Sequence, residues 1–439
     1  MRRLQRRLLT IVRSFWFIPV LCVLSAIVLA ESIVALDRIL PDLPPLPVLA
    51  PIFDLGVEGS RGLLTGIGGT TFGAAATAFS ITISVVATAS TNYGPRLVGN
   101  FMSDRQNQWV LGVLVSTFVY TTLVVRTLRS ATEDGAAFVP HIAVSFGILL
   151  AIADVFLVIA FIHHISVSIQ VGTLTGMVQR RFRQAVRARD AEGSLHALSD
   201  RQAPEGGRLV RAGEEGYIVH IDADALVAAA SADGGRVALE CRVGDLLLPE
   251  SPVARIWAAQ DADRLADSVR GAIDTAPQRD PLGDVGYALQ QMLELAVRAG
   301  EDPYTAAGVV EDLGVVMTEA VAGPEPVEAI GDESGAPRLY RRVFGLGELI
   351  DAVFDQARPF ASGKPVVLQA LVELAARIES HVAHDHLRGR AWEHVELIRE
   401  ACEAEGLVPR ELAALDAAIE RARGLVELSG QEREAGRLS

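Results

Sequence analysis

The sequence predicts an α+β membrane protein with four transmembrane helices, a small β-sandwich module and a C-terminal α-helical cytoplasmic domain. Three observations support this. Four long apolar segments come first, short β-branched runs between Gly and Pro turns fill residues 205–257, and helical periodicity follows. We therefore expect a transmembrane domain (1–178), a basic juxtamembrane linker (179–204), a β module (205–257), a helical cytoplasmic domain (258–430) and a flexible tail (431–439).

The four apolar segments are long enough to cross a bilayer as helices. They lie at residues 15–36, 63–89, 109–125 and 139–169. The first one follows an arginine-rich start, which a cleaved signal peptide would also show. We favour a retained helix, because three more apolar segments follow and no small-residue cleavage site ends the run.

Arginine placement predicts the topology. Arginines crowd before the first span, and five more follow the fourth span: Arg180, Arg181, Arg183, Arg187 and Arg189. The positive-inside rule then places both termini in the cytoplasm, with the chain a multi-pass membrane protein. The formal net charge of −14 belongs to the second half of the chain, which argues against nucleic acid as a partner.

The second span carries a stripe of small and weakly polar residues at steps of three or four, the period of one helix face. Its members are Gly66, Gly69, Gly73, Thr77, Ser80, Ser84 and Thr88. One interpretation is a helix packing seam. The other is a hydroxyl-lined path for water or ions, around the axis of an oligomer. Both interpretations require this face to be turned away from lipid.

Asp154 is an ionisable residue in the middle of the fourth span. Its role is either an ion or proton site, or a hydrogen bond to the Ser/Thr stripe. His163 and His164 lie near the cytoplasmic end of the same span. They would either sense pH or be polar residues at the water interface, and we favour the second interpretation. The first and third spans lack such features, so we expect ordinary lipid-facing helices there.

The β module has a strand pattern similar to that of lipoyl- and biotinyl-type domains. Residues 205–257 contain no lysine, which excludes a swinging cofactor arm. In the helical domain, His381, His384 and Asp385 are spaced to share one helix face, a geometry compatible with a metal, but no zinc signature accompanies them. We favour a solvated face. The sequence shows no nucleophile or nucleotide motif either, so we expect neither an enzyme nor a cofactor.

Several stretches together resemble DUF2254, a family of predicted bacterial integral membrane proteins. They are residues 77–129, the strand module, Asp302-Pro-Tyr-Thr-Ala306 and Phe354-Asp355-Gln356-Ala-Arg358. Where relatives typically have Ser-Pro-x-x-Asn-Asp-Pro, this chain has Arg298-Ala-Gly-Glu-Asp-Pro303, so a site built on that asparagine is in doubt here. The resemblance implies an architecture and no particular activity.

These observations favour a homo-oligomeric protein of the channel or transport class, embedded in the lipid bilayer. The second-span stripe and Asp154 would line or support the path, and the β module would form a cytoplasmic vestibule. The alternative is a membrane-anchored scaffold or sensor whose acidic cytoplasmic domain recruits a protein partner. A metal-dependent enzyme using His381 and His384 is a distant third.

Overall fold

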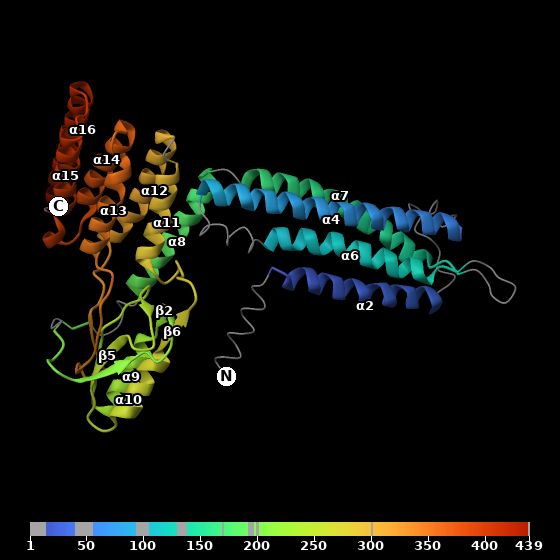
Figure 1. Cartoon of the computed structure of the whole chain (residues 1–439), viewed down its shortest axis with the longest axis horizontal. Coiled ribbons are helices and arrows are strands. Elements are labelled where there is room, and N and C mark those ends of the chain that lie inside the picture. The colour runs from blue at the N-terminus through green and yellow to red at the C-terminus, as the bar shows by residue number, and fades with distance from the viewer. Residues whose placement is uncertain are drawn as a thin grey trace. The chain divides into compact units, whose positions relative to one another are not determined.

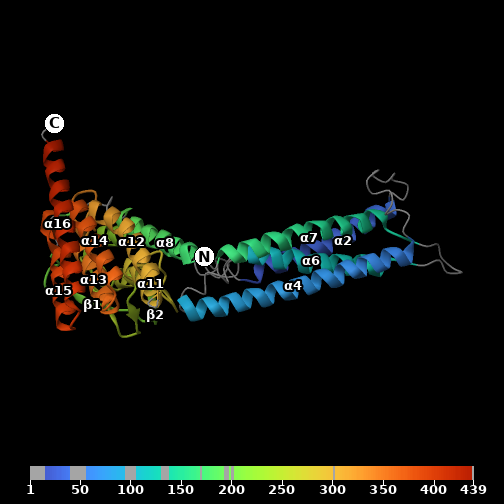
Figure 2. The same cartoon turned by 90° about the horizontal axis from the view of Figure 1, so that it is seen from above.

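The computed structural model describes residues 15–39, 56–93, 105–129, 138–168, 171–191, 197–198, 202–299 and 302–437. The chain forms two compact units, Met1–Thr173 and Leu174–Ser439. The first unit is a bundle of long helices, and the second combines two β-sheets with a set of helices (Figures 1 and 2). The arginine-rich start and most of the loop at 41–62 lie outside the described residues.

Four helices of the first unit are long and apolar enough to cross a membrane, which confirms the four expected spans. They are α2 (Phe17–Ile39), α4 (Val57–Tyr93), α6 (Arg105–Thr127) and α7 (His141–Ser168). The 37 residues of α4 span about 55 Å at 1.5 Å per residue. Because a bilayer core is about 30 Å thick, α4 extends beyond it.

Helix α6 is the centre of the bundle, in contact with α2, α4 and α7 (Figure 2). Its apolar window is 44% buried, against 22–28% for the other three spans. The prediction that the third span is an ordinary lipid-facing helix is therefore wrong. Apolar content cannot separate the two positions, because lipid and a helix interface are equally apolar. The sequence signal for the central position of α6 was its polar side chains. Those that α6 buries are Asn107, Gln108, Thr117, Tyr120 and Thr121.

Three glycines allow these helices to approach closely. A Cβ atom on Gly68 of α4 would lie 2.7 Å from Thr121 Oγ1, and one on Gly147 of α7 would lie 2.8 Å from a methyl group of Leu64. A Cβ on Gly112 of α6 would meet the backbone of α2 at 3.1 Å. Such small-residue contacts are the usual packing device of membrane helices.

Asp37, which the sequence analysis did not single out, ties α2 to the start of α7. Its two carboxylate oxygens accept hydrogen bonds from the backbone N–H groups of Ile142 and Ala143, each at 2.9 Å. An anion at a helix N-terminus satisfies donors that have no partner within the helix. The Tyr120 hydroxyl donates to the carbonyl of Ala143 at 2.9 Å, so α6 joins the same contact.

The second unit contains a five-stranded sheet in the order β1-β5-β3-β8-β7 and a three-stranded sheet in the order β4-β2-β6. The pair β3–β8 is parallel and the other described pairs are antiparallel. The strands are β1 (Arg208–Arg211), β2 (Gly216–Ile221), β3 (Arg236–Leu239), β4 (Leu246–Leu247), β5 (Pro252–Trp257), β6 (Ile273–Ala276), β7 (Ala329–Gly331) and β8 (Pro337–Tyr340).

The lipoyl- or biotinyl-type sandwich is not confirmed, because helices and distant strands share the core of these sheets. Helices α9 (Ala223–Asp233) and α10 (Ala262–Ala272) pack on the sheets, with Leu226, Leu265 and Val269 in the same apolar cluster as the strands. Strands β7 and β8 come from residues 258–430, where the sequence predicts a helical domain. Strand propensity is local, so it cannot say which distant segment completes a sheet.

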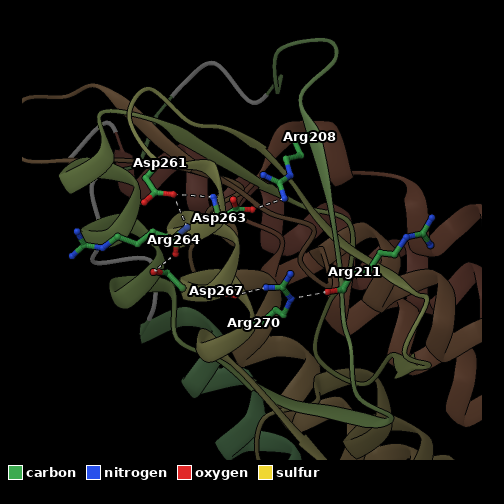
Figure 3. A network of polar contacts seen from close by, with 8 residues as sticks. Arg208, Arg211, Asp261, Asp263, Arg264, Asp267 and Arg270 are labelled. Atoms are coloured by element: carbon green, nitrogen blue, oxygen red, sulfur yellow. Dashed lines mark hydrogen bonds and ion pairs between the residues drawn. The ribbon is translucent and has the colours of Figure 1, made fainter.

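Polar contacts join α10 to the edge strand β1 (Figure 3). Arg208 pairs with Asp263 at 2.7 Å, and Arg270 donates to the backbone carbonyl of Arg211 at 3.2 Å. Asp261 caps α10 by accepting from the N–H groups of Asp263 and Arg264. The exposed pair adds little stability, so the contacts mainly fix how the helix covers the edge of the sheet.

The remaining helices of the second unit pack together beside the sheets (Figure 1). They are α8 (Val171–Ala191), α11 (Val285–Arg298), α12 (Pro303–Ala322), α13 (Leu346–Ala361), α14 (Pro365–His381), α15 (Arg390–Ala404) and α16 (Pro409–Arg437). The arginines of α8 lie on a helix that packs on this unit: Arg183 pairs with Glu319 of α12 at 3.0 Å. Helices α11 to α15 and most of α16 fall within residues 258–430, where the sequence predicts a helical domain.

Candidate functional site

Asp154 lies at the midpoint of α7 and points into the helix bundle. Asp154 is 13 residues from His141, the first residue of the helix, and 14 from Ser168, the last. It is 4% exposed. One apolar cluster, which includes Leu64, Tyr120 and Val144, lies on one side of this level of the bundle. A second cluster, which includes Ala75, Leu114 and Phe161, lies on the other side. Asp154 is thus enclosed between two apolar layers.

The neighbouring helices supply hydroxyl groups at the level of Asp154. On α4 the residue between the two clusters is Thr71, and on α6 it is Thr117; both are buried. Thr71 donates to the carbonyl of Gly68 at 3.1 Å, and Thr117 donates to that of Val113 at 3.2 Å. Each hydroxyl group therefore has a hydrogen-bond acceptor in its own helix.

Neither oxygen of the Asp154 carboxyl group has a hydrogen-bond partner among the described residues. Thr117 lies beside it, and the Thr117 hydroxyl donates to the carbonyl of Val113 at 3.2 Å. An ionised carboxylate in the middle of a membrane span costs several kcal/mol or more unless a partner or water compensates it. By contrast, both carboxylate oxygens of Asp37 accept backbone hydrogen bonds. Asp37 therefore has a structural task, and no such contact is described for the carboxyl group of Asp154.

The second-span stripe does not meet Asp154. All seven of its residues, Gly66, Gly69, Gly73, Thr77, Ser80, Ser84 and Thr88, are exposed in the single chain. Within the described residues nothing lies within 4 Å of a Cβ placed on any of its three glycines. The face of α4 that packs inside the bundle is the opposite one, with Leu64, Gly68, Thr71, Ala75, Ala78 and Thr82. A hydrogen bond between Asp154 and the stripe is excluded by this geometry.

The stripe hydroxyls that have described contacts are satisfied within α4. Thr77 donates to the carbonyl of Gly73 at 2.9 Å, and Thr88 donates to that of Ser84 at 3.0 Å. The stripe therefore presents a smooth, low-polarity surface. The orientation of this surface away from lipid stays a prediction.

His163 and His164 lie one turn or more from the last residue of α7. His163 is exposed and His164 is half-buried. They are nine and ten residues beyond Asp154, or roughly 14 Å along the helix, so they do not belong to its immediate surroundings. Their proposed role in pH sensing stays a prediction.

The helix face predicted for His381, His384 and Asp385 does not exist, because α14 ends at His381. The His381 ring bonds the carbonyl of Arg377 in its own helix, at 2.7 Å. The His384 ring bonds the carbonyl of Gly323 at 2.9 Å, and Asp385 begins a short 3₁₀ turn. No group of three or more His, Cys, Asp or Glu residues that could hold a metal occurs in the described parts of the chain.

Two motifs behind the family resemblance have structural roles. Asp302 caps α12, accepting from the N–H groups of Tyr304 and Thr305, with Pro303 at the first helical position. Phe354 of α13 stacks on the buried ring of His394 from α15, with ring centroids 5.2 Å apart. Asp351 receives a hydrogen bond from this ring and an ion pair from Arg390, and Arg390 lowers the pKa of the Asp351 carboxyl group.

Comparison with known sequences agrees with the resemblance. Residues 12–377 match a family described as "Predicted membrane protein (DUF2254)". Uncharacterised proteins of Mycobacterium bovis and Mycobacterium tuberculosis are 26% identical to this chain over 387 residues, which cover 84% of this chain and 73% of theirs. No solved structure matches the chain. With four helices that could span a membrane and a family match over most of its length, this chain belongs to the DUF2254 family of predicted membrane proteins.

Proposed function

We propose that this protein is a homo-oligomer of the bacterial cytoplasmic membrane, of the channel or transport class, in which Asp154 takes up and releases a proton. The observation that carries the proposal is the Asp154 carboxyl group, buried at the midpoint of a membrane span with neither oxygen hydrogen-bonded among the described residues. A group of this kind contributes no stabilising contact, and intramembrane acids commonly mark ion or proton pathways.

A proton suits this site better than a metal cation. Membrane sites for Na⁺ use backbone carbonyls that a break in a helix has released. Here α4, α6 and α7 run without interruption past the level of Asp154, so their carbonyls stay within the helices. Two carboxyl oxygens and the hydroxyls of Thr71 and Thr117 are too few ligands for Ca²⁺ and poorly suited to Mg²⁺. A proton needs one oxygen only.

The stripe on α4 has a different task in this proposal. Gly69 and Gly73 each lie two residues from Thr71, which places them about 160° around the helix from it. A path at Asp154 and a path at the stripe would thus lie on opposite sides of α4. Gly69 and Gly73 form a Gly-x-x-x-Gly pair, a spacing that favours close helix contact in lipid. We assign the stripe to contact between copies of the chain, and Asp154 to the path within each copy.

The proposed topology places both termini and the second unit in the cytoplasm. Its support is the arginine bias of the sequence on the flanks of the first and fourth spans. In this arrangement the sheets of the second unit serve as a cytoplasmic vestibule or as a surface for a protein partner.

Proton movement in liposomes tests the function. Purified protein is reconstituted with a pH-sensitive dye inside, and an imposed pH gradient is followed. The protein should dissipate the gradient faster than empty liposomes, Asp154→Asn should lose this effect, and Asp154→Glu should retain part of it. Asp37→Asn is not a suitable control, because Asp37 supports α7. Glu31→Gln is a suitable control, because the ion pair described for Glu31, with Arg126, is exposed. Equal flux with Asp154→Asn would contradict the proposal.

Cross-linking tests the contact between copies. A cysteine in place of Ser80, on the stripe, should form a disulfide-linked dimer in membranes. A cysteine in place of Phe156, which is 69% exposed on α7, should form far less. The three native cysteines are buried and free, so they add little background. Equal cross-linking at both positions would argue for random collision and against the assigned face.

A further inference from the structure

The second unit contains a cavity of about 390 Å³ at one edge of its five-stranded sheet. Strands β3 and β8 run parallel there, with Val237 opposite Leu339 and Ala238 opposite Tyr340. Their carboxyl ends therefore meet at the same edge, and the residues that follow each strand line the cavity. In sheets with parallel strands, ligands bind outside the carboxyl ends. The position of the cavity is thus one where binding sites occur.

Three arginines line this cavity: Arg242 after β3, and Arg341 and Arg342 directly after β8. Arg242 is held in place by Glu348, through contacts of 2.8 and 2.9 Å, and by the ring of Phe344, at 5.3 Å. Arg341 is anchored by a hydrogen bond from Nε to the carbonyl of Val327, at 2.7 Å. Two of the three guanidinium groups are therefore positioned before any ligand arrives.

Two of the three glutamates that line the cavity are held in ion pairs with arginines. Glu348 is paired with Arg242, and Glu240 is paired with Arg255 at 2.7 Å. Glu328 is the third acid of the wall. Arg342 is exposed and makes no ion pair within the part of the chain that the structure describes. Outside these two ion pairs, the lining holds two arginines, Arg341 and Arg342, and one acid, Glu328.

Helix α13 adds to the preference for an anion. It begins at Leu346, four residues after Arg342, and its N-cap is Gly345, which provides no side chain to satisfy the first N–H groups. Glu348 in its first turn lines the cavity, so the start of this 16-residue helix lies at the cavity wall. Unsatisfied N–H groups at a helix start favour phosphate oxygens.

We propose that this cavity binds a small molecule through a phosphate group, held by Arg341, Arg342 and the start of α13. Arginine forks match phosphate oxygens in geometry and charge. A cavity of about 390 Å³ is in the size range of small-molecule sites, so it accommodates an organic group attached to the phosphate. This site is independent of Asp154, and it would make the second unit a ligand-binding module.

Calorimetric titration of the full-length protein in detergent tests the proposal, with adenosine monophosphate, inorganic phosphate and adenosine as probes at constant ionic strength. Adenosine monophosphate should bind best, phosphate more weakly, and adenosine not at all. Arg342→Gln should weaken binding at least about tenfold, as expected for loss of a charge-assisted hydrogen bond. Arg264→Gln is the matched control, because Arg264 is exposed on α10 (Figure 3) and is not among the residues that line the cavity.

Two results would overturn the proposal. One is the absence of heat with both phosphate-bearing probes. The other is binding that Arg341→Gln and Arg342→Gln leave unchanged. Because Arg342 is exposed and the Arg342→Gln variant removes no described ion pair, its thermal unfolding should match that of the unmutated protein, which separates lost binding from lost folding.

Discussion

Adjacent glycines on α4 give a sharp test of which face of this helix is buried. Gly68 lies against α6, where an added Cβ would come within 2.7 Å of Thr121 Oγ1. This hydroxyl donates to the carbonyls of Thr117 at 2.9 Å and Phe118 at 3.0 Å, so moving it breaks hydrogen bonds as well as packing. Gly69, the next residue, has nothing within 4 Å of the same added atom.

The expected difference between Gly68→Ala and Gly69→Ala follows from this geometry. Both substitutions gain the same helix propensity, up to about 1 kcal/mol. Only Gly68→Ala overpacks the bundle, at a cost of about 1–3 kcal/mol. The free energy of unfolding of Gly68→Ala should therefore fall below that of Gly69→Ala by about 1–3 kcal/mol.

The assay is SDS-induced unfolding of the detergent-solubilised chain, followed by circular dichroism, at a protein-to-detergent ratio where the protein is monomeric. Under these conditions contacts between copies do not contribute to the measured stability. Equal stability of the two variants, or a less stable Gly69→Ala, would show that α4 is rotated relative to the structure. The assignment of the stripe to an outward face would then fail with it.

Three further predictions concern single contacts. Asp37→Ala should lower the free energy of unfolding by about 2–4 kcal/mol in the same SDS assay, because the start of α7 loses two charge-assisted hydrogen bonds; a change under about 0.5 kcal/mol would contradict that role. Arg279→Ala should lower it by about 3 kcal/mol in thermal or urea unfolding, because Asp284, paired with Arg279 at 2.6 Å, is left as a buried charge; an unchanged midpoint would refute this. The folded-state pKa of Asp351 lies below its usual value because of Arg390, so this carboxylate stabilises the fold above about pH 4 and the effect is lost as pH falls through the lowered pKa. Thermal midpoints measured from pH 6 down to pH 3 should thus fall less steeply for Asp351→Asn than for the unmutated protein.

The sequence was sufficient for the number and approximate positions of the long apolar helices, because a helix that crosses lipid needs a long apolar segment whatever its neighbours are. It did not predict their ends: α4 is ten residues longer than the expected segment 63–89. The sequence could not show which face of each helix is buried in the bundle. Small residues follow both sides of α4. Gly68 faces α6 and Thr71 is buried, whereas nothing described lies near a Cβ added to Gly69 or Gly73, and local sequence does not separate the two sets. The buried threonines of α6 were a usable signal for its central place.

In the second unit, local signals predicted helices better than they predicted sheets. Helix α9 was missed although its ends are marked, with Asp222 as N-cap and Gly234 in the left-handed conformation at φ 73° as C-cap. The partnership of β3 with β8 joins residues about 100 positions apart, which no local pattern encodes. The sequence alone therefore could not predict the cavity at the carboxyl ends of β3 and β8.

The central claim is that the Asp154 carboxyl group exchanges a proton in the folded protein. Infrared difference spectroscopy, comparing the unmutated protein with Asp154→Asn during a pH titration in lipid, observes this group directly. The claim predicts a carbonyl band of the protonated acid that is absent from Asp154→Asn and that disappears as the pH rises. A band that keeps its intensity at every pH, or no band assignable to Asp154 at any pH, would contradict it.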